Sequence, residues 1–552
     1  MKLDLLIHHA DIRTQDPLHP RAHTLGVLGG RVVGLDSEVT GIPARRTVDL
    51  HHAVVLPGFN DAHCHTTWYG LTLASVDLLP ARSLDDVYRA IAARAAVSAP
   101  GAWVVANGFD HHHLGGRYPD IDELDKAAGG RPVYIRHMSG HASIVNTATL
   151  RLAGVFAPDF AEPVGGGVRR RPDGRPSGLL EEQAQHLVQD LVLPYSQADI
   201  AAALERATRV YAAEGITSFT EAGIAGGWIG HSPVELAAYQ TAREDGRLHA
   251  RAQLMVTLDA LHPVVAHPDD HAGIGLDLGL RTGMGDDHLS IGPTKVFVDG
   301  SLFGETAAVS EPYCTAQHRE GYFQLAPDDL RARMLDAYRS GWSLAAHAIG
   351  DRAIDLALDI MAEARVAYGP HRVPNRLEHG GVIRPDQIPA LAAAGVAVVP
   401  QPNFLHQFGD GMARSLGPAR TAWSYRVRSL LEAGVCVPGS SDRPCADGVA
   451  LRGVQAFVER LTGSGATYGP GERVTAEQAV RAYTVGSAAA TGFAGVKGAL
   501  ATGQLADFVV LSAAPSDVPA EEISAIEVLA TSVGGRFTHD ALGLAERTLL
   551  LT

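Results

Sequence analysis

Short apolar runs that follow amphipathic helical stretches recur along this chain from about residue 200. Residues 204–213 have the period of an amphipathic helix, Gly215 follows them, and residues 216–220 form a β-branched run. A glycine just past a helix end adopts the left-handed conformation that lets the chain turn back. Strands that alternate with helices form a parallel sheet buried on both faces, and eight of them close into a barrel. The pattern therefore predicts an α/β fold with a (β/α)8 TIM-like barrel.

The same unit recurs further along the chain. Helix-like stretches at 330–339, 388–394 and 430–433 each end at a glycine before an apolar run. The predicted barrel strands are 53–58, 216–220, 252–257, 290–298, 342–346, 375–379, 396–400 and 435–439.

Both ends of the chain have a different pattern from its middle. Residues 1–52 and 497–552 alternate as short strands joined by tight turns. Because short isolated sheets are only marginally stable, we expect the two ends to pair into one composite β-sandwich module. The barrel would then occupy residues 53–496. A stretch after the first strand, at about 70–200, is too long for one crossover, and we interpret it as an inserted subdomain that covers the barrel mouth and selects the substrate.

The composition excludes several classes of protein. The 552 residues are 46% hydrophobic and 19% charged, which supports a large core and excludes extensive disorder. A net charge of −15 argues against a nucleic-acid partner, because phosphate binding needs a basic surface. No apolar stretch is long enough to cross a membrane, and the N-terminus lacks the apolar core of a signal peptide. The four cysteines form no Cys-x-x-Cys motif, so we expect a soluble protein of the reducing cytoplasm.

Residue types that bind metals follow five of the predicted strands. His63 and His65 come two positions apart after the first strand, and on an extended backbone such residues point the same way. One histidine at a strand end is most often an ordinary hydrogen-bonded residue. In a chain with 26 histidines, a His-x-His pair also arises readily by chance, so the pair alone is a weak signal. Recurrence at one mouth of a barrel is much harder to attribute to chance. Imidazoles with a carboxylate suit zinc or a similar divalent ion. The remaining candidates are Lys295, His347, His379 and Asp442.

Several motifs resemble those of the amidohydrolase superfamily, and within it the amidohydrolase-3 (YtcJ-like) branch, which includes N-substituted formamide deformylase. The resemblance covers nearly the whole chain and is specific to the family but not to a substrate. It rests on the stretches 57–65, 108–110, 124–146, 174–179, 299–301, 347–351, 401–402, 441–444 and 483–507.

The resemblance implies a ligand set of one or two divalent ions per chain. His63, His65 and Asp442 would hold one ion, and His347 and His379 would hold a second. Lys295 would bridge the two as a carbamate formed with carbon dioxide, because an ammonium group would be repelled by two cations. The alternative is an unmodified Lys295 beside a single metal ion.

The resemblance also implies a reaction. A metal lowers the pKa of bound water, so that hydroxide can attack a carbonyl group at neutral pH. Asp442 would pass the proton to the departing nitrogen. His141, in the insertion, is the candidate for orienting the substrate, and a hydrogen-bonded structural role is its alternative. We therefore expect a hydrolase of the C–N bond in a small N-substituted amide or formamide. A cyclic amide, urea or carbamate is the alternative substrate, and a catalytically silent metal-binding barrel is the alternative outside enzymes. The sequence admits a homodimer without specifying one.

Overall fold

The computed structural model describes residues 2–111, 114–137, 142–163, 166–227, 229–270, 273–315 and 318–544. The chain forms two compact units. One contains Met1–Thr67 together with Leu204–Thr552, and the other contains Trp68–Ala203.

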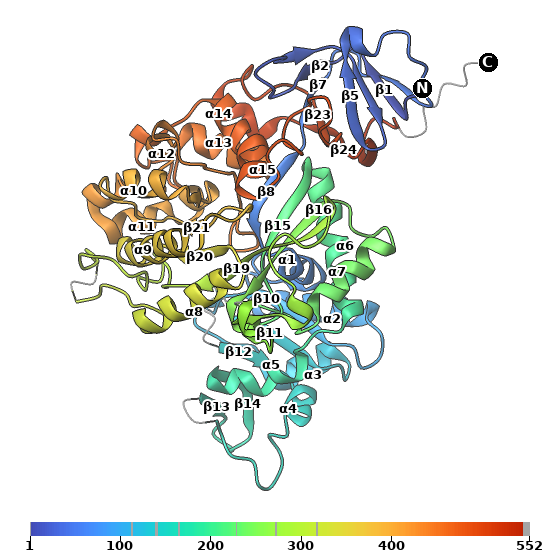
Figure 1. Ribbon diagram of the computed structural model, residues 1–552. Helices are drawn as coiled ribbons and strands as arrows, with labels where there is room; N and C mark the ends of the chain where they lie inside the picture. The colour runs from blue at the N-terminus through green and yellow to red at the C-terminus, as the bar shows by residue number, and fades with distance from the viewer. Residues whose placement is uncertain are drawn as a thin grey trace. The chain divides into compact units, whose positions relative to one another are not determined.

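Seven parallel strands form a barrel in the larger unit, and they neighbour one another in the order in which they occur in the chain (Figure 1). All seven are buried almost throughout, as expected for strands covered on both faces. They confirm the predicted α/β barrel. The strands are β8 (Phe59–Cys64), β15 (Ile216–Ile224), β16 (Arg251–Thr257), β19 (Leu289–Phe297), β20 (Leu344–Ala348), β21 (Arg376–His379) and β22 (Ala397–Val399).

The predicted eighth strand, 435–439, is not a regular strand, although it lies between β22 and β8. The Val398 N–H donates to the carbonyl of Cys436, and the Ala62 N–H donates to the carbonyl of Gly439, each at 3.0 Å. A full ladder cannot form, because Pro438 has no N–H and the Gly439 N–H donates to the carbonyl of Ala482. This segment closes the barrel with few hydrogen bonds.

The predicted first strand, 53–58, was wrong. Residues Val54–Pro57 form β7, which pairs with β23 (Phe508–Leu511) and β2 (Asp11–Arg13) outside the barrel. The barrel strand β8 begins only after Gly58, where the chain passes so close to Thr217 that a Cβ would lie 2.2 Å from its side chain. An uninterrupted apolar run hides this change of sheet, since both strands are buried.

Two sheets lie outside the barrel, and the second combines strands from both ends of the chain, so that blue β7 and red β23 lie side by side in Figure 1. They share one hydrophobic core, to which Ile7, Ile12, Val55, Phe508 and Val510 contribute. The first sheet has the order β5 (Arg31–Leu35), β4 (Leu25–Leu28), β1 (Leu5–His8), β6 (Thr47–Asp49). The second has the order β25 (Arg536–Asp540), β24 (Val528–Val533), β23, β7, β2, β3 (Arg21–Ala22).

The unit Trp68–Ala203 contains a six-stranded mixed sheet with helices packed on it. Its strands are β13 (Gly166–Arg170), β14 (Pro176–Glu182), β12 (Ala142–Val145), β11 (Val133–His137), β10 (Val104–Phe109) and β9 (Val76–Asp77). Its helices are α2 (Leu84–Val97), α3 (Ile121–Ala128), α4 (Thr147–Leu152) and α5 (His186–Val192). Helices α1 (Thr66–Ala74) and α6 (Gln197–Ala213) connect the two units.

Helices follow most of the barrel strands as the hydrophobic pattern predicted, whereas the described residues between β16 and β19 form 3-10 turns and the short strands β17 (His262–Pro263) and β18 (Ile274–Gly275). The helices are α7 (Glu235–Glu244), α8 (Pro327–Arg339), α9 (Asp351–Tyr368), α10 (Gln387–Ala394), α11 (Asn403–Thr421), α12 (Arg428–Glu432), α13 (Ala450–Glu459), α14 (Ala476–Arg481) and α15 (Ser487–Ala490). Among the described residues, no helix combines the length and the apolar character needed to cross a bilayer.

Candidate metal centre

The candidate ligands lie at the carboxyl ends of the barrel strands. His63 is in β8, His65 directly follows it, Lys295 is near the end of β19, and His347 is near the end of β20. His379 is the last residue of β21, and Asp442 follows the segment that closes the barrel. All are buried except His347, whose side chain is 13% exposed.

Two lone pairs face each other between His63 and Asp442. The Nδ1 of His63 donates to the buried carboxylate of Glu378, and in a neutral ring the Nε2 then carries no proton. This Nε2 lies 3.2 Å from Oδ1 of Asp442, and among the described residues neither buried atom has a hydrogen-bond partner. Two facing acceptors repel each other unless a cation lies between them, so this geometry fits a bound metal ion.

His65 completes the group on the same carboxylate oxygen. Its Nε2 lies 3.1 Å from Oδ1 of Asp442, and the rings of His63 and His65 are nearly perpendicular. The three side chains form one group of potential ligand atoms within 4.8 Å of one another. Asp442 and His379 both have positive φ, at 57° and 72°. Strain of this kind in residues other than glycine concentrates at functional sites.

His379 and His347 lie beside this group. The ring of His379 is 5.0 Å from that of His63 and 4.5 Å from that of His347. His379 Nδ1 donates to Oε1 of Gln401 at 2.7 Å, and His347 Nε2 donates to the carbonyl of Gly300 at 3.0 Å. These bonds leave one unprotonated nitrogen on each ring. The two rings are adjacent, and the role of His347 and His379 as metal ligands stays a prediction.

The electrostatics of the site favour the forms of these side chains that bind metals. Burial, followed by the charge of Lys295, lowers the pKa of His347 to about 3, and burial also lowers the pKa of His65 and His379. Burial opposes the charged form of Asp442, but the adjoining imidazoles of His63 and His65 take its pKa well below the usual value. Neutral imidazoles and an ionised carboxylate are the forms that metals require.

Lys295 is buried at the same mouth of the barrel. Burial lowers its pKa to about 8, despite the nearby carboxylates of Glu378 and Asp442. Its Nζ lies 5.0 Å from the ring centre of Phe297. A cavity of about 190 Å³ is lined by Lys295, Phe297, Thr257 and Gln324 among others. Lys295 is the candidate ligand that lines this cavity.

The sequence reasoning missed the residues that orient the ligands, above all Glu378. Its carboxylate holds His63 and forms a two-point ion pair with Arg376, at 2.8 and 2.9 Å, with both side chains fully buried. Arg376 also donates to the carbonyl of Ala62 at 2.6 Å. A signal was present, because Arg376 and Glu378 are charged residues two positions apart in a strand predicted to be buried. Gln401, which orients His379, was noted only as part of a motif.

His141, the predicted substrate-orienting residue, lies outside the described residues. Arg443, next to Asp442, forms a two-point ion pair with Glu214 at 2.8 and 3.1 Å, and its carbonyl accepts the His65 N–H at 2.7 Å.

Known proteins resemble this chain over nearly its whole length. The N-substituted formamide deformylase of Arthrobacter pascens is 30% identical over 98% of this chain and 99% of its own. The protein LONG AFTER FAR-RED 3 of Arabidopsis thaliana is 30% identical over 97% of this chain and 91% of its own. An uncharacterised metal-dependent hydrolase from Pyrococcus horikoshii has the same fold, with a TM-score of 0.75 and 23% identity over 94% of this chain and 99% of its own.

The family model for the amidohydrolase family matches residues 46–539, which confirms the resemblance drawn from the motifs. The match spans the barrel, the inserted unit and most of the C-terminal end segment, but only the last residues of the N-terminal one. This chain belongs to the amidohydrolase family, the metal-dependent hydrolases of carbon–nitrogen bonds.

Proposed function

We propose that this enzyme hydrolyses the C–N bond of a small N-substituted amide, with formamides as the first candidates. The observation that carries the proposal is the convergence of His63 Nε2, His65 Nε2 and Asp442 Oδ1, with no proton between the first and the last. The formamide deformylase that shares 30% identity over nearly both whole chains supports this substrate class.

The metal would be held by two adjoining groups of residues. His63, His65 and Asp442 would hold one ion, and His347 and His379 would hold a second, with zinc as the first expectation because imidazole and carboxylate donors suit it. When bound, a divalent ion lowers the pKa of water and polarises a carbonyl oxygen. The chain's own residues supply the rest of the chemistry.

Asp442 is the proposed proton carrier. Its ionised Oδ1 faces the point between the two histidines, where it can accept a proton from water and later donate it to the departing nitrogen. An amine leaves poorly unless it is protonated, so this transfer matters most for amide substrates. His141 remains the proposed residue that orients the substrate.

We further propose that Lys295 is carbamylated. The lone pair of its neutral amine forms a bond to the carbon of carbon dioxide, and a proton is released as the anionic carbamate forms. Burial supports the neutral amine, because it lowers the pKa of Lys295 to about 8. Two ions would then share the carbamate, whereas an unmodified amine would accompany one ion. Native mass spectrometry that shows one added carbon dioxide, lost on acidification, supports the carbamate, and an unchanged mass contradicts it.

Two broader expectations belong to the same proposal. All four cysteines are free thiols, which supports a reducing compartment such as the cytoplasm. A homodimer is the proposed assembly, and light scattering of the purified protein tests it directly.

The experiment that tests the substrate class measures amine release from paired N-formyl, N-acetyl and longer N-acyl amines. The metal-loaded enzyme is compared with Asp442→Asn, which serves as the blank. Turnover concentrated on the formyl compounds supports formamide hydrolysis. Silence across the whole panel, with metal still bound, contradicts the proposal and moves the substrate to a cyclic amide, urea or carbamate.

A further inference from the structure

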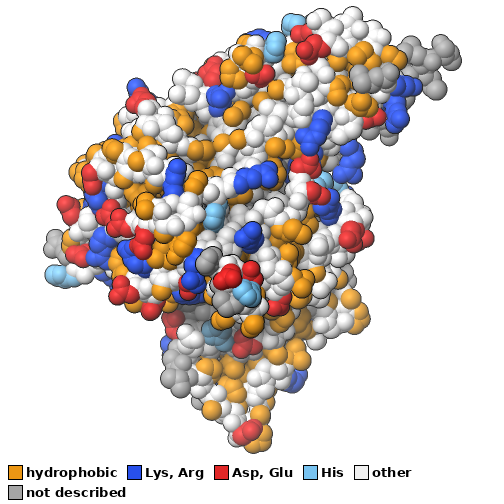
Figure 2. Space-filling model, viewed as in Figure 1, with side chains coloured by type: hydrophobic (Ala, Val, Ile, Leu, Met, Phe, Trp, Pro, Cys, Tyr) orange, Lys and Arg blue, Asp and Glu red, His pale blue; other side chains and the backbone are white. Residues whose placement is uncertain are grey.

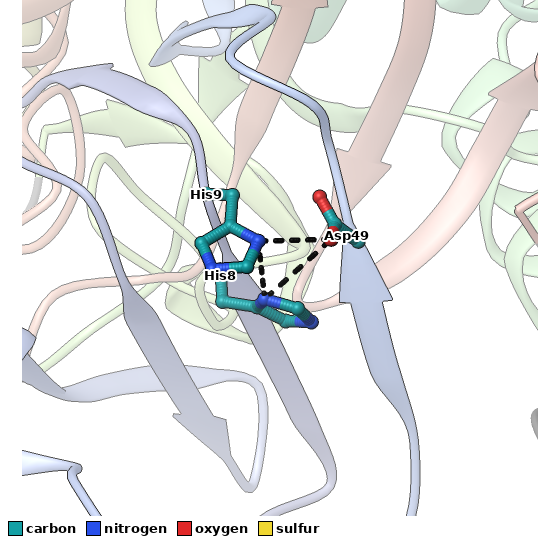
Figure 3. Close-up of side chains that lie close together, drawn as sticks. All are labelled: His8, His9 and Asp49. Atoms are coloured by element: carbon teal, nitrogen blue, oxygen red, sulfur yellow. Dashed lines mark hydrogen bonds and ion pairs between the residues drawn. The ribbon is translucent and has the colours of Figure 1, made fainter.

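A second group of potential metal ligands lies outside the barrel, in the sheet formed by the chain's N-terminal strands. His8 is the last residue of β1, His9 follows it, and Asp49 is the last residue of the neighbouring strand β6 (Figure 3). His8 and Asp49 are paired in the parallel register. Nothing in the proposed hydrolysis uses these residues.

Three donor atoms converge in this group, as Figure 3 shows. Nδ1 of His8 lies 3.2 Å from Nδ1 of His9, and Nδ1 of His9 lies 2.9 Å from Oδ2 of Asp49. Nδ1 of His8 lies 3.9 Å from the same oxygen. With metal–ligand distances of about 2.0–2.1 Å, two ligands of a tetrahedral zinc ion are about 3.3 Å apart. The observed separations bracket that value, so one ion can contact all three atoms after small side-chain rotations.

More imidazoles surround the group. Nδ1 of His51 lies 3.3 Å from the other carboxylate oxygen of Asp49, and the ring of His52 lies 6.4 Å from that of His9. A fourth ligand is therefore available from the turn that follows β6, or from water. Four histidines and one aspartate within two short turns make a donor set rich in nitrogen. Such a set binds borderline ions such as zinc in preference to Ca²⁺ or Mg²⁺, which take oxygen ligands.

The backbone of these turns is strained in a way that gathers the imidazoles. His9, His51 and His52 have φ values of 53°, 46° and 67°. They are three of the thirteen residues other than glycine with positive φ in the described chain. Such conformations are unfavourable for residues other than glycine and persist only where the surrounding structure determines them. The two turns are held together by the His52 N–H, which donates to the carbonyl of His9 at 2.6 Å.

We propose that His8, His9 and Asp49 form a second site for a divalent transition-metal ion of the zinc class, separate from the barrel site. His8 and Asp49 are about one-third exposed, while His9 is 64% exposed, so the ion would enter from solvent. The ion would tie the end of β1 to the turn after β6. Its role is structural, because it adds a link between these two strands to their backbone pairing and their shared hydrophobic core.

The test counts zinc ions bound by the untagged full-length chain after equilibration at micromolar free zinc. His8→Gln/His9→Gln is the test variant. His262→Gln/His267→Gln is the matched control, since it also removes two exposed histidines, each 3.5 Å from one aspartate. We expect the test variant to bind one zinc ion fewer than the wild type, and the control to bind as many as the wild type. Equal numbers in all three proteins overturn the proposal.

A second measurement keeps the test informative if the variants differ in folding. Asp49→Asn retains an oxygen that accepts the His51 N–H, a bond of 2.9 Å in the native turn, but it removes the charge that an ion needs. Loss of a ligand should weaken zinc binding at this site by at least about tenfold. Zinc should raise the melting temperature of the wild type more than that of Asp49→Asn. An equal rise in both proteins overturns the proposal.

Discussion

Replacing Glu378 with glutamine should damage the barrel site without touching a ligand. The carboxylate now accepts the His63 Nδ1 proton with one oxygen and the two N–H groups of Arg376 with both. A glutamine keeps one acceptor oxygen but presents an NH₂ group to a guanidinium that has only donors. Arg376 is then left buried without its counter-charge, and the lone pair of His63 is no longer held toward Asp442.

Two magnitudes follow from this geometry. Removing one partner of a buried ion pair costs about 3–5 kcal/mol of stability, and both side chains here are fully buried. Loss of a residue that orients a ligand weakens metal binding by about 10–100-fold, which corresponds to about 1.4–2.8 kcal/mol.

Glu472→Gln is the matched control for Glu378→Gln. Glu472 is also a buried acid, paired with Arg426 at 3.0 Å, and it accepts the backbone N–H groups of Val427 and Ser429. Thermal unfolding of the metal-free proteins and zinc competition against a chromophoric chelator should separate the two effects. We expect both variants to be less stable and only Glu378→Gln to bind zinc more weakly. Wild-type zinc affinity in Glu378→Gln would refute the argument that this carboxylate orients His63.

Three further predictions follow from the same structure. Asp442→Asn should reduce amine release by orders of magnitude while the far-ultraviolet circular dichroism stays unchanged, and near-normal turnover would exclude Asp442 as the proton carrier. Removal of metal by a chelator should abolish turnover, and zinc with bicarbonate should restore it to a greater extent than zinc alone if Lys295 is a carbamate. Burial lowers the pKa of Lys497 to about 7 despite Asp507, so between pH 7 and 10.5 the unfolded chain holds a proton that the folded chain has lost. Stability should therefore rise with pH over this window. Lys497→Met should raise the melting temperature by several degrees below pH 7, and its melting temperature should equal that of the wild type near pH 10.5. A difference in melting temperature that does not change with pH would contradict the lowered pKa of Lys497.

Much of the barrel could be predicted from local patterns. Apolar runs placed six of the seven barrel strands within a few residues, and three of these runs follow helical stretches that end at Gly215, Gly341 and Gly395. The error at β7 arose because burial is the only property that a local apolar run reports. The partner of Val54–Pro57 is β23, about 450 residues away in the chain, and hydrophobicity carries no information about which buried sheet a strand joins.

The candidate site divides in the same way. Imidazole, amine and carboxylate groups at strand ends could be identified from residue type and position, because parallel strands bring their carboxyl ends to one mouth. Which nitrogen of each imidazole is protonated could not be identified from the sequence. It depends on the acceptors Glu378, Gln401 and the carbonyl of Gly300, which lie on other strands or loops than the histidines they contact. The pairing of His8 and His9 with Asp49 was also hidden, because 40 residues separate them in the chain.

The sequence by itself determined the order of helices and strands, the position of the donor side chains and the family. These properties depend on the period of apolar residues and on short motifs, both of which are local. Only the tertiary structure decided where the barrel begins, how an irregular segment closes it, and which lone pairs point at one another. Those properties depend on contacts between segments hundreds of residues apart, and hydrogen-bond geometry across such contacts exists only once the chain has folded.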